Sequence, residues 1–199
     1  SRDLVTLLGA YGVDVGRGYA LDEEALDIIQ SIRRSVGFKN TQMRYPYFVH
    51  RTRDQFKAPD HLALRGLYSL SMFWPAPLKL SESLSEGVTG EVLLTTSPKG
   101  WIDREGDLTP WVKPPESDEA RGELGLIATL SGTLQSAFAD DRGEATQESE
   151  PPSGLYAELK RTGRVLKRST TRAKLAVVSS SELVSDFLLF DPGLGPYYK

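Results

Sequence analysis

Two segments rich in serine and threonine carry the side chains best suited to holding a polar ligand. Residues 95–98 (TTSP) follow the apolar run Val92–Leu94 and lead to Trp101, and residues 179–181 (SSS) follow a second apolar run. In open α/β sheets, ligands bind in the crevice at the carboxyl ends of the strands. Hydroxyl groups placed there exchange hydrogen bonds with a ligand, and an indole ring offers a stacking surface. The pattern predicts a ligand-binding site made of Thr96, Ser97, Trp101, Ser180, Ser181 and Glu182.

The same residues also have structural explanations. Trp101 is an aromatic side chain that can close the end of a sheet core. One of the three serines can cap a helix predicted over 182–190, with Glu182 in its favourable first turn. Both alternatives stay open at the level of sequence.

Catalytic chemistry has less support. A nucleophilic serine needs a positioned base, and the only histidines are His50 and His61. The chain has no G-x-S-x-G motif, and the spacing of its histidines matches no helical metal site. We therefore predict no catalytic residue and no metal ligand. The alternative is a hydrolase of a small polar or sugar substrate, in which Asp103, Asp186 or Glu182 would work with His61.

Composition narrows the class of protein. The 199 residues include 24 basic and 27 acidic side chains, a net charge of −3, which argues against a nucleic-acid-binding protein. The absence of cysteine excludes thiol catalysis, disulfides and thiolate metal sites. No phosphate-binding glycine motif is present, so the sequence predicts no cofactor. A dense basic group over residues 160–174 is suited to an acidic partner or to anionic lipid headgroups.

The elements that would position these side chains alternate between helix and strand. Apolar spacing predicts helices over 4–11, 22–32, 155–166 and 182–190, a helix or helical turn over 61–70, and strands over 18–21, 45–50, 89–95, 124–132 and 174–179. This alternation predicts a single α/β domain over 1–199 with a parallel or mixed sheet. Residues 140–154, acidic and without large aliphatic side chains, are predicted to form a mobile or disordered loop. No apolar run is long enough to span a membrane, and both ends of the chain are abrupt, which suggests a segment of a longer protein.

Several segments, taken in order, resemble one family. They are LLGAYGVDVGRGYALD near the start, HLALRGLYSLSMFWPAPLKLSE from His61, VTGEVLLTTSPKGWID from Val88, LGLIATLSGTLQSAF from Leu124 and KLAVVSSSELVSDFLL from Lys174. Together they are similar to the extracytoplasmic domain of the auxiliary component of gliding-motility-type ABC transporters. The positions that match its motifs are Arg65, Gly66, Leu67, Thr96, Ser97, Pro98, Trp101, Gly132, Ser136, Phe138, Ser181, Ser185 and Asp186. The largest departure is at residues 179–183, SSSEL, where the family has Gly-Asp-Ser-Asp-Phe.

The resemblance implies a three-layer Rossmann-like fold related to glutamine-amidotransferase-like domains, N-terminally incomplete because the family's domain normally begins with further strands. That fold's usual nucleophile is a cysteine, so a chain without cysteine fits a non-catalytic role. The implied function is binding or scaffolding beside the permease and ATPase subunits of a transporter, with a polar ligand, a glycan or an envelope protein as partner. The implied location is the periplasmic side of the cytoplasmic membrane, with the membrane anchor in other parts of the parent protein.

A third functional alternative is a purely structural module that assembles the transporter. It predicts an exposed apolar patch, for which Phe73 and Trp74 are the candidates.

Overall fold

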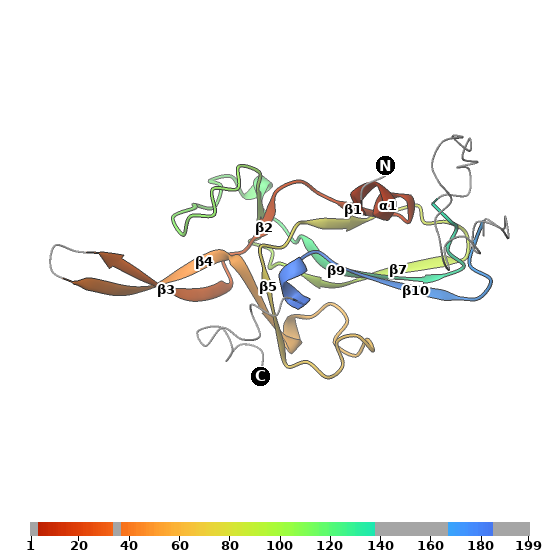
Figure 1. The fold of residues 1–199 in the computed structure, drawn as a ribbon, viewed down its shortest axis with the longest axis horizontal. Coiled ribbons are helices and arrows are strands. Elements are labelled where there is room, and N and C mark those ends of the chain that lie inside the picture. Colours follow the sequence, from red (N-terminus) through yellow and green to blue (C-terminus); the bar gives the residue numbers. More distant parts are fainter. Residues whose placement is uncertain (1–3, 34–36, 138–166, 185–199) are drawn as a thin grey trace, which may run out of the picture.

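The computed structural model describes residues 4–33, 37–137 and 167–184, which form an elongated and mostly β-stranded molecule (Figure 1). Its elements, in chain order, are α1 (Leu4–Ala10), β1 (Val13–Val15), β2 (Tyr19–Leu21), β3 (Ala25–Arg33), β4 (Phe38–Thr52), the 3₁₀ turn η1 (Arg53–Gln55), β5 (Ser69–Phe73), β6 (Leu78–Leu80), β7 (Val88–Thr95), β8 (Trp101–Asp103), η2 (Asp118–Ala120), β9 (Gly125–Gly132), β10 (Ala173–Val178) and η3 (Ser181–Val184). The predicted helix 155–166 and loop 140–154 lie outside the described residues, as does most of the helix predicted over 182–190.

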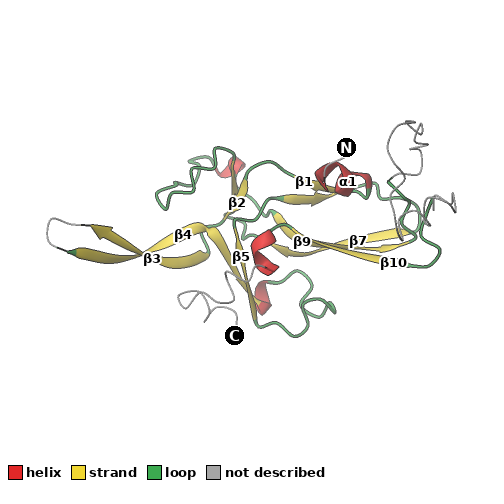
Figure 2. Ribbon diagram, viewed as in Figure 1, coloured by secondary structure: helices red, strands yellow, loops and turns green. Residues whose placement is uncertain are grey.

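The largest sheet is antiparallel and is built around β9. Strand β7 pairs along one edge of β9, and β10 pairs with it from Ala173↔Gly132 to Val178↔Ile127. Strands β1 and β6 form a second antiparallel pair, which joins the sheet through Leu78↔Gly125. Helix α1 lies beside this pair, as Figure 2 shows. One face of β7–β9–β10 is therefore covered by the layer of α1, β1 and β6.

A second sheet, of order β3–β4–β5, includes a long two-stranded projection. We call the part of β3 and β4 from Asp27↔Arg44 to Arg33↔Phe38 the arm. It extends away from the body at the opposite end of the molecule from the β7–β10 sheet (Figure 1). Strand β5 pairs only with the base of β4, from Phe48↔Phe73 to Thr52↔Ser69.

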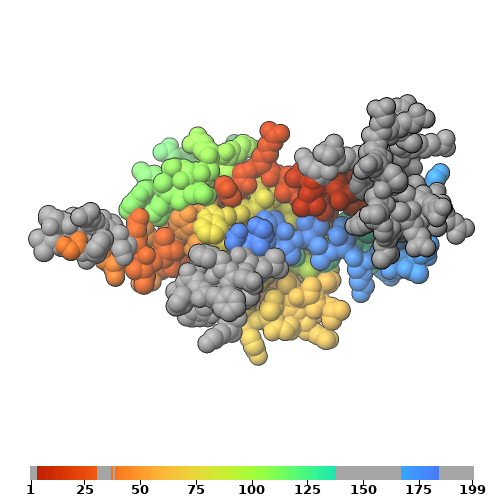
Figure 3. Space-filling view, in the orientation of Figure 1, coloured from red at the N-terminus to blue at the C-terminus, as the bar shows by residue number. Residues whose placement is uncertain are grey.

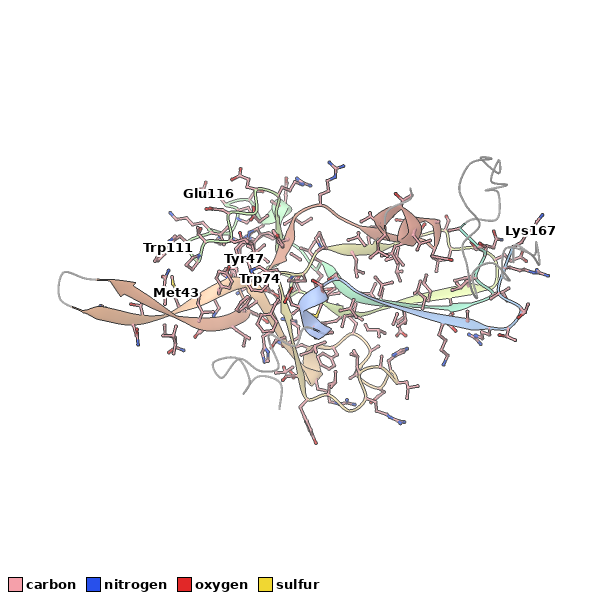
Figure 4. The ribbon with its side chains drawn as sticks, in the orientation of Figure 1. Met43, Tyr47, Trp74, Trp111, Glu116 and Lys167 are labelled. Atoms are coloured by element: carbon pink, nitrogen blue, oxygen red, sulfur yellow. The ribbon has the colours of Figure 1, made fainter. Side chains whose placement is uncertain are left out.

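The core consists of three clusters of buried side chains. The first, with Val13, Leu78 and Leu130, lies between the α1–β1–β6 layer and the sheet. The second, with Leu93 and Ile127, packs against the segment after β4 through Phe56 and Leu64. The third is aromatic and joins the arm to the body; Tyr47 and Trp74 meet there, as Figure 4 shows.

This architecture corrects the predicted fold class. The three-layer Rossmann-like domain with a parallel or mixed sheet is wrong, because every strand pair in the described residues is antiparallel and α1 is the single α-helix among them. Buried runs such as 92–94 suggested parallel strands, whose two faces are both covered. Here the antiparallel sheet is itself covered on both faces near the start of β9, by the α1–β1–β6 layer and by residues 53–67.

Strand β7 also contains an irregularity that produces its continuous apolar run. The register shifts between Val92↔Ala128 and Leu94↔Ile127, so one extra residue is accommodated there. A β-bulge of this kind breaks the alternation of inward and outward side chains. Consequently Leu93 and Leu94 are both buried, which alternation alone does not allow.

The strands were predicted more accurately than the helices. The strands expected over 18–21, 45–50, 89–95, 124–132 and 174–179 are confirmed, as is the first helix. The helix expected over 22–32 is wrong, and the helix or helical turn expected over 61–70 is confirmed only as a single turn, in which the Arg65 N–H donates to the His61 carbonyl at 2.9 Å. The first is strand β3, whose isoleucines favour extended backbone and whose partner is β4. The second is a loop of turns that leads into β5.

Candidate functional site

The segment 96–101, here called the hydroxyl loop, is turned inward. Thr96 is fully buried, and its backbone N–H donates to the carbonyl of Leu124 at 2.9 Å. Its hydroxyl accepts from the Leu124 N–H at 2.9 Å and lies 3.3 Å from the carbonyl of Gly122. Thr96 therefore fastens the end of β7 to the residues that lead into β9.

Ser97 is also fully buried and is held by the carboxylate of Asp22, which is itself 0% exposed. The Ser97 N–H donates to Asp22 Oδ2 at 2.5 Å, and the Ser97 hydroxyl donates to Oδ1 at 2.6 Å. The hydroxyl oxygen accepts in turn from the Lys99 N–H at 3.1 Å. Both hydrogen-bonding capacities of this hydroxyl are used within the protein.

Asp22 belongs to an acidic triplet, residues 22–24, that ties three parts of the chain together. Arg51 of β4 is 6% exposed and donates to Glu24 at 2.7 Å, with Asp22 Oδ2 at 3.8 Å from the same nitrogen. Glu23 pairs with Arg121 at 2.6 Å, on the long loop after β8. A buried carboxylate needs such compensation, because desolvating its charge is costly. The sequence analysis did not predict this cluster. The one feature of the sequence that pointed to it is the run of three acidic residues directly after the strand predicted over 18–21.

Trp101 lies in the core. It is 5% exposed, begins β8, pairs with Leu21 and packs in the aromatic cluster with Tyr47 and Phe73. The geometry favours the alternative in which Trp101 closes the sheet core.

The second predicted segment lies near the end of β10. Ser180 is 8% exposed, and its hydroxyl donates to the carbonyl of Phe73 at 2.6 Å. Ser181 is exposed, and its hydroxyl lies 3.4 Å from Glu182 Oε1. Residues 179–181 line a cavity of about 400 Å³ with α1, separate from the surroundings of the hydroxyl loop. The structure does not bring the two predicted segments into one cavity.

The groups invoked for hydrolysis are also dispersed. His50 Nδ1 lies 2.9 Å from the hydroxyl of Ser71, but Ser71 is 2% exposed. Asp103 accepts from the Tyr47 hydroxyl at 2.5 Å and from two backbone N–H groups of its own turn. His61 accepts from the Ala63 N–H at 3.2 Å on a different loop. Asp186 lies outside the described residues.

The environment of His50 leads to a pH prediction. Burial, together with the neighbouring charge of Arg51, lowers the pKa of the imidazole from its usual 6.5. The unfolded chain then binds a proton at a higher pH than the folded chain does, so the stability that His50 contributes is present above the unfolded pKa and is lost as the pH falls through it. We expect His50→Gln to lose less stability than the wild type between about pH 8 and pH 5. Urea unfolding at each pH measures the difference; parallel curves for the two proteins would contradict it.

The largest described cavity lies directly in front of the hydroxyl loop. It has a volume of about 710 Å³ and opens between the β1–β6 pair and the β7–β9 sheet, so we call it the interlayer cavity. Its apolar wall consists of Leu78, Leu80, Val92, Ile102 and Leu124. Thr95 and Ile102, which flank the hydroxyl loop, line it, whereas Thr96, Ser97 and Trp101 lie outside its lining.

Charged side chains form the rim of this cavity. Lys57 and Glu123 make an ion pair at 2.5 Å, and Asp14 and Lys79 stand on the β1–β6 side. A mostly apolar wall with a few polar groups at the mouth is the usual composition of a ligand pocket, and the volume falls within the common range of about 300–1,000 Å³. The interlayer cavity is the candidate functional site.

Comparison with known proteins gives one match. No curated protein and no solved structure resembles the chain closely enough to count as a match. Among the helices of the described residues, none combines the length and apolarity needed to cross a bilayer. The family described as "ABC-type uncharacterized transport system" matches all of residues 1–199, and the chain belongs to that family.

Proposed function

We propose that the chain is a non-catalytic binding domain of an ABC-type transport system, and that the interlayer cavity receives an apolar group of its partner. The observation that carries the proposal is the contrast between the cavity and the hydroxyl loop behind it. The hydroxyl groups of Thr96 and Ser97 in the loop are engaged within the protein. The cavity in front of it offers an apolar wall that is open to a ligand.

In this proposal the residues predicted from sequence act on binding indirectly. Thr96 and Ser97 hold the ends of β7 and β9 in register, and Trp101 fixes the start of β8. These elements supply Val92, Thr95, Ile102 and Leu124 to the cavity wall. The hydroxyl loop therefore positions the site from behind.

Support for a non-catalytic role comes from the state of the candidate nucleophiles. Ser97 and Ser71 are almost completely buried, so a substrate does not reach their hydroxyls. Ser181 is exposed, but it lies by the separate cavity at the end of β10. The structural-assembly alternative loses its predicted patch, because Phe73 is fully buried and Trp74 packs against the aromatic cluster.

We further propose that the domain acts on the extracytoplasmic side of the membrane, beside the permease and ATPase subunits of its own system. An aliphatic or aromatic side chain of one of these subunits, or of an envelope protein, matches the cavity wall. The rim charges Lys57 and Glu123 would fix its orientation. A role in motility is a narrower form of the same proposal.

The test fills the cavity without disturbing the hydroxyl loop. Val92→Trp places an indole in the interlayer cavity, and Val178→Trp makes the same change on β10, outside that cavity. Co-purification with the permease and ATPase subunits is measured for the wild type and both variants, along with the melting temperature of each. We expect Val92→Trp to reduce the recovered complex roughly tenfold, while Val178→Trp retains it. Equal recovery with Val92→Trp, at an unchanged melting temperature, would overturn the proposal.

A further inference from the structure

The opposite face of the main sheet carries a second concave surface. It has a volume of about 550 Å³ and lies between the loop residues His61–Ala63 and strands β9 and β10. The two parts lie side by side in Figure 3, with the loop in gold and β10 in blue. Successive residues of each strand line it, Thr129–Ser131 on β9 and Lys174–Ala176 on β10. This surface, here called the β10 groove, therefore runs along the strands.

The charges of the β10 groove all have one sign. Arg172 and Lys174 line it, and its lining contains no aspartate or glutamate. The Arg172 Nε donates to the Ser131 hydroxyl at 3.1 Å, which orients the guanidinium and leaves its terminal nitrogens without a partner among the described residues. Neither cation forms an ion pair within the described residues. Two unpaired cations beside hydroxyl groups are a complement for carboxylates.

Strand β10 also offers unpaired main chain. It is the last strand of the sheet order and, in the described part of the chain, it pairs only with β9. An open strand edge is a template for another extended segment, whose main chain completes the ladder of hydrogen bonds. Leu62, which is 71% exposed, adds an apolar contact at the loop side of the groove.

We propose that an extended acidic segment of a protein partner adds as a strand to the free edge of β10 and directs its acidic side chains over the adjacent β10 groove. Alternate side chains of such a strand point to opposite faces of the sheet. On β10, Lys174 and Ala176 face the groove, whereas Leu175, which also borders it, and Val177 pack in the apolar layer under α1. The segment recognised is therefore one in which acidic and apolar residues alternate.

One acidic side chain sets the position of the partner. Glu91 of β7 pairs with Thr129 of the central strand β9. On the other side of β9, Thr129 pairs with Ala176 of β10. A carboxylate of the partner is repelled near β7 and attracted near Lys174, so the acidic residues lie toward β10. The recessed groove and the free strand edge favour a peptide over an anionic membrane, whose flat surface contacts protruding charges.

The test uses a short fluorescent peptide of alternating glutamate and valine, with an alternating lysine–valine peptide for comparison. Anisotropy titration against the protein should show binding of the glutamate peptide that weakens with added salt. We expect Lys174→Glu to raise the Kd roughly tenfold, whereas Lys39→Glu, the same change on the arm, leaves it within about twofold. N-methylation of alternate amides of the peptide should also abolish binding, because it blocks pairing with β10.

Three results would overturn the inference: equal binding of the lysine peptide, an unchanged Kd for Lys174→Glu, and full binding of the N-methylated peptide. Co-sedimentation with phosphatidylserine vesicles, dependent on Lys174 and without peptide binding, would assign the groove to a membrane surface instead. The groove lies on the other face of the sheet from the interlayer cavity, so either outcome leaves the proposed function to its own test.

Discussion

Asp22→Ala is expected to lower the free energy of unfolding by about 3–5 kcal/mol, which is the usual cost of removing one partner from a buried charged pair. The carboxylate is fully buried and accepts hydrogen bonds from the Ser97 N–H, the Ser97 hydroxyl and the Glu24 N–H. Alanine leaves these donors without an acceptor in a site that water does not enter. Arg51, whose buried Nε has no partner among the described residues, also loses the nearby charge of Asp22.

Urea unfolding of the two proteins measures this loss, and Asp27→Ala is the matched control. Asp27 also pairs with an arginine, Arg44, at 2.6 Å, but both side chains are partly exposed, at 34% and 53%. A solvated pair of this kind contributes about 0–1 kcal/mol. A double variant with Ser97→Ala sharpens the result: once Asp22 is absent, removal of the Ser97 hydroxyl should cost little more. Similar losses for Asp22→Ala and Asp27→Ala would contradict the account.

The strands of the fold were predictable from sequence because their signal is local. Val88–Thr95 and Gly125–Gly132 carry β-branched and aliphatic residues. The first run is bounded by Gly87 and by Pro98, and the second begins and ends with glycine, so both are recognisable as strands without reference to their partners. Their direction was not predictable in the same way. A strand whose consecutive residues are all apolar is buried on both faces of its sheet. Parallel sheets, which have helices packed on both faces, are the common setting for such strands. Here the cover comes from an α1–β1–β6 layer and an irregular loop, which leave no periodic mark in the sequence.

The arm illustrates a second limit. Residues 25–32 contain Ala25, Leu26, Ile28, Ile29 and Ile32, a spacing that fits one face of a helix. The structure makes them a strand, because the segment from Phe38 supplies an antiparallel partner along its length. Ile29 is 73% exposed, so its position in the pattern does not mark a buried face at all. Tertiary pairing overrides local periodicity here.

The sequence predicts a ligand site in the hydroxyl loop, and this stays a prediction. The loop lies next to the interlayer cavity, because its chain neighbours Thr95 and Ile102 line that cavity. The role predicted for its side chains needed three-dimensional information. Asp22 lies 75 positions away from Ser97 in the chain, and only the fold shows that its carboxylate occupies the hydrogen-bonding capacity a ligand would have used. A hydroxyl-rich loop after a strand is therefore compatible with two different functions. Its hydroxyl groups can form hydrogen bonds with a ligand, or they can form hydrogen bonds within the protein and hold the fold together.

Trp101→Ala separates these two functions, and we expect it to destabilise the protein by about 3–5 kcal/mol, as large-to-small changes of buried aromatic residues do. The indole is 5% exposed and packs among the aromatic side chains that join β2, β4 and β8. Its removal leaves a void at the point where the arm meets the body. Trp101→Phe keeps an aromatic ring in this place, so it should cost less than half as much.

Unfolding of both variants is compared with that of Trp111→Ala, which removes an indole that is 59% exposed (Figure 4) and should change stability by no more than about 0.5 kcal/mol. A tryptophan that stacks on a ligand from an exposed position would behave as Trp111 does here, losing binding while the unfolding midpoint stays near that of the wild type. If Trp101→Ala gave that result, the indole would be exchanging between the core and the cavity mouth, and the hydroxyl loop would contact the ligand directly. If Trp101→Ala instead unfolds early and Trp101→Phe restores most of the midpoint, the loop acts as the rear wall of the site, and ligand contact belongs to residues such as Val92 and Leu124.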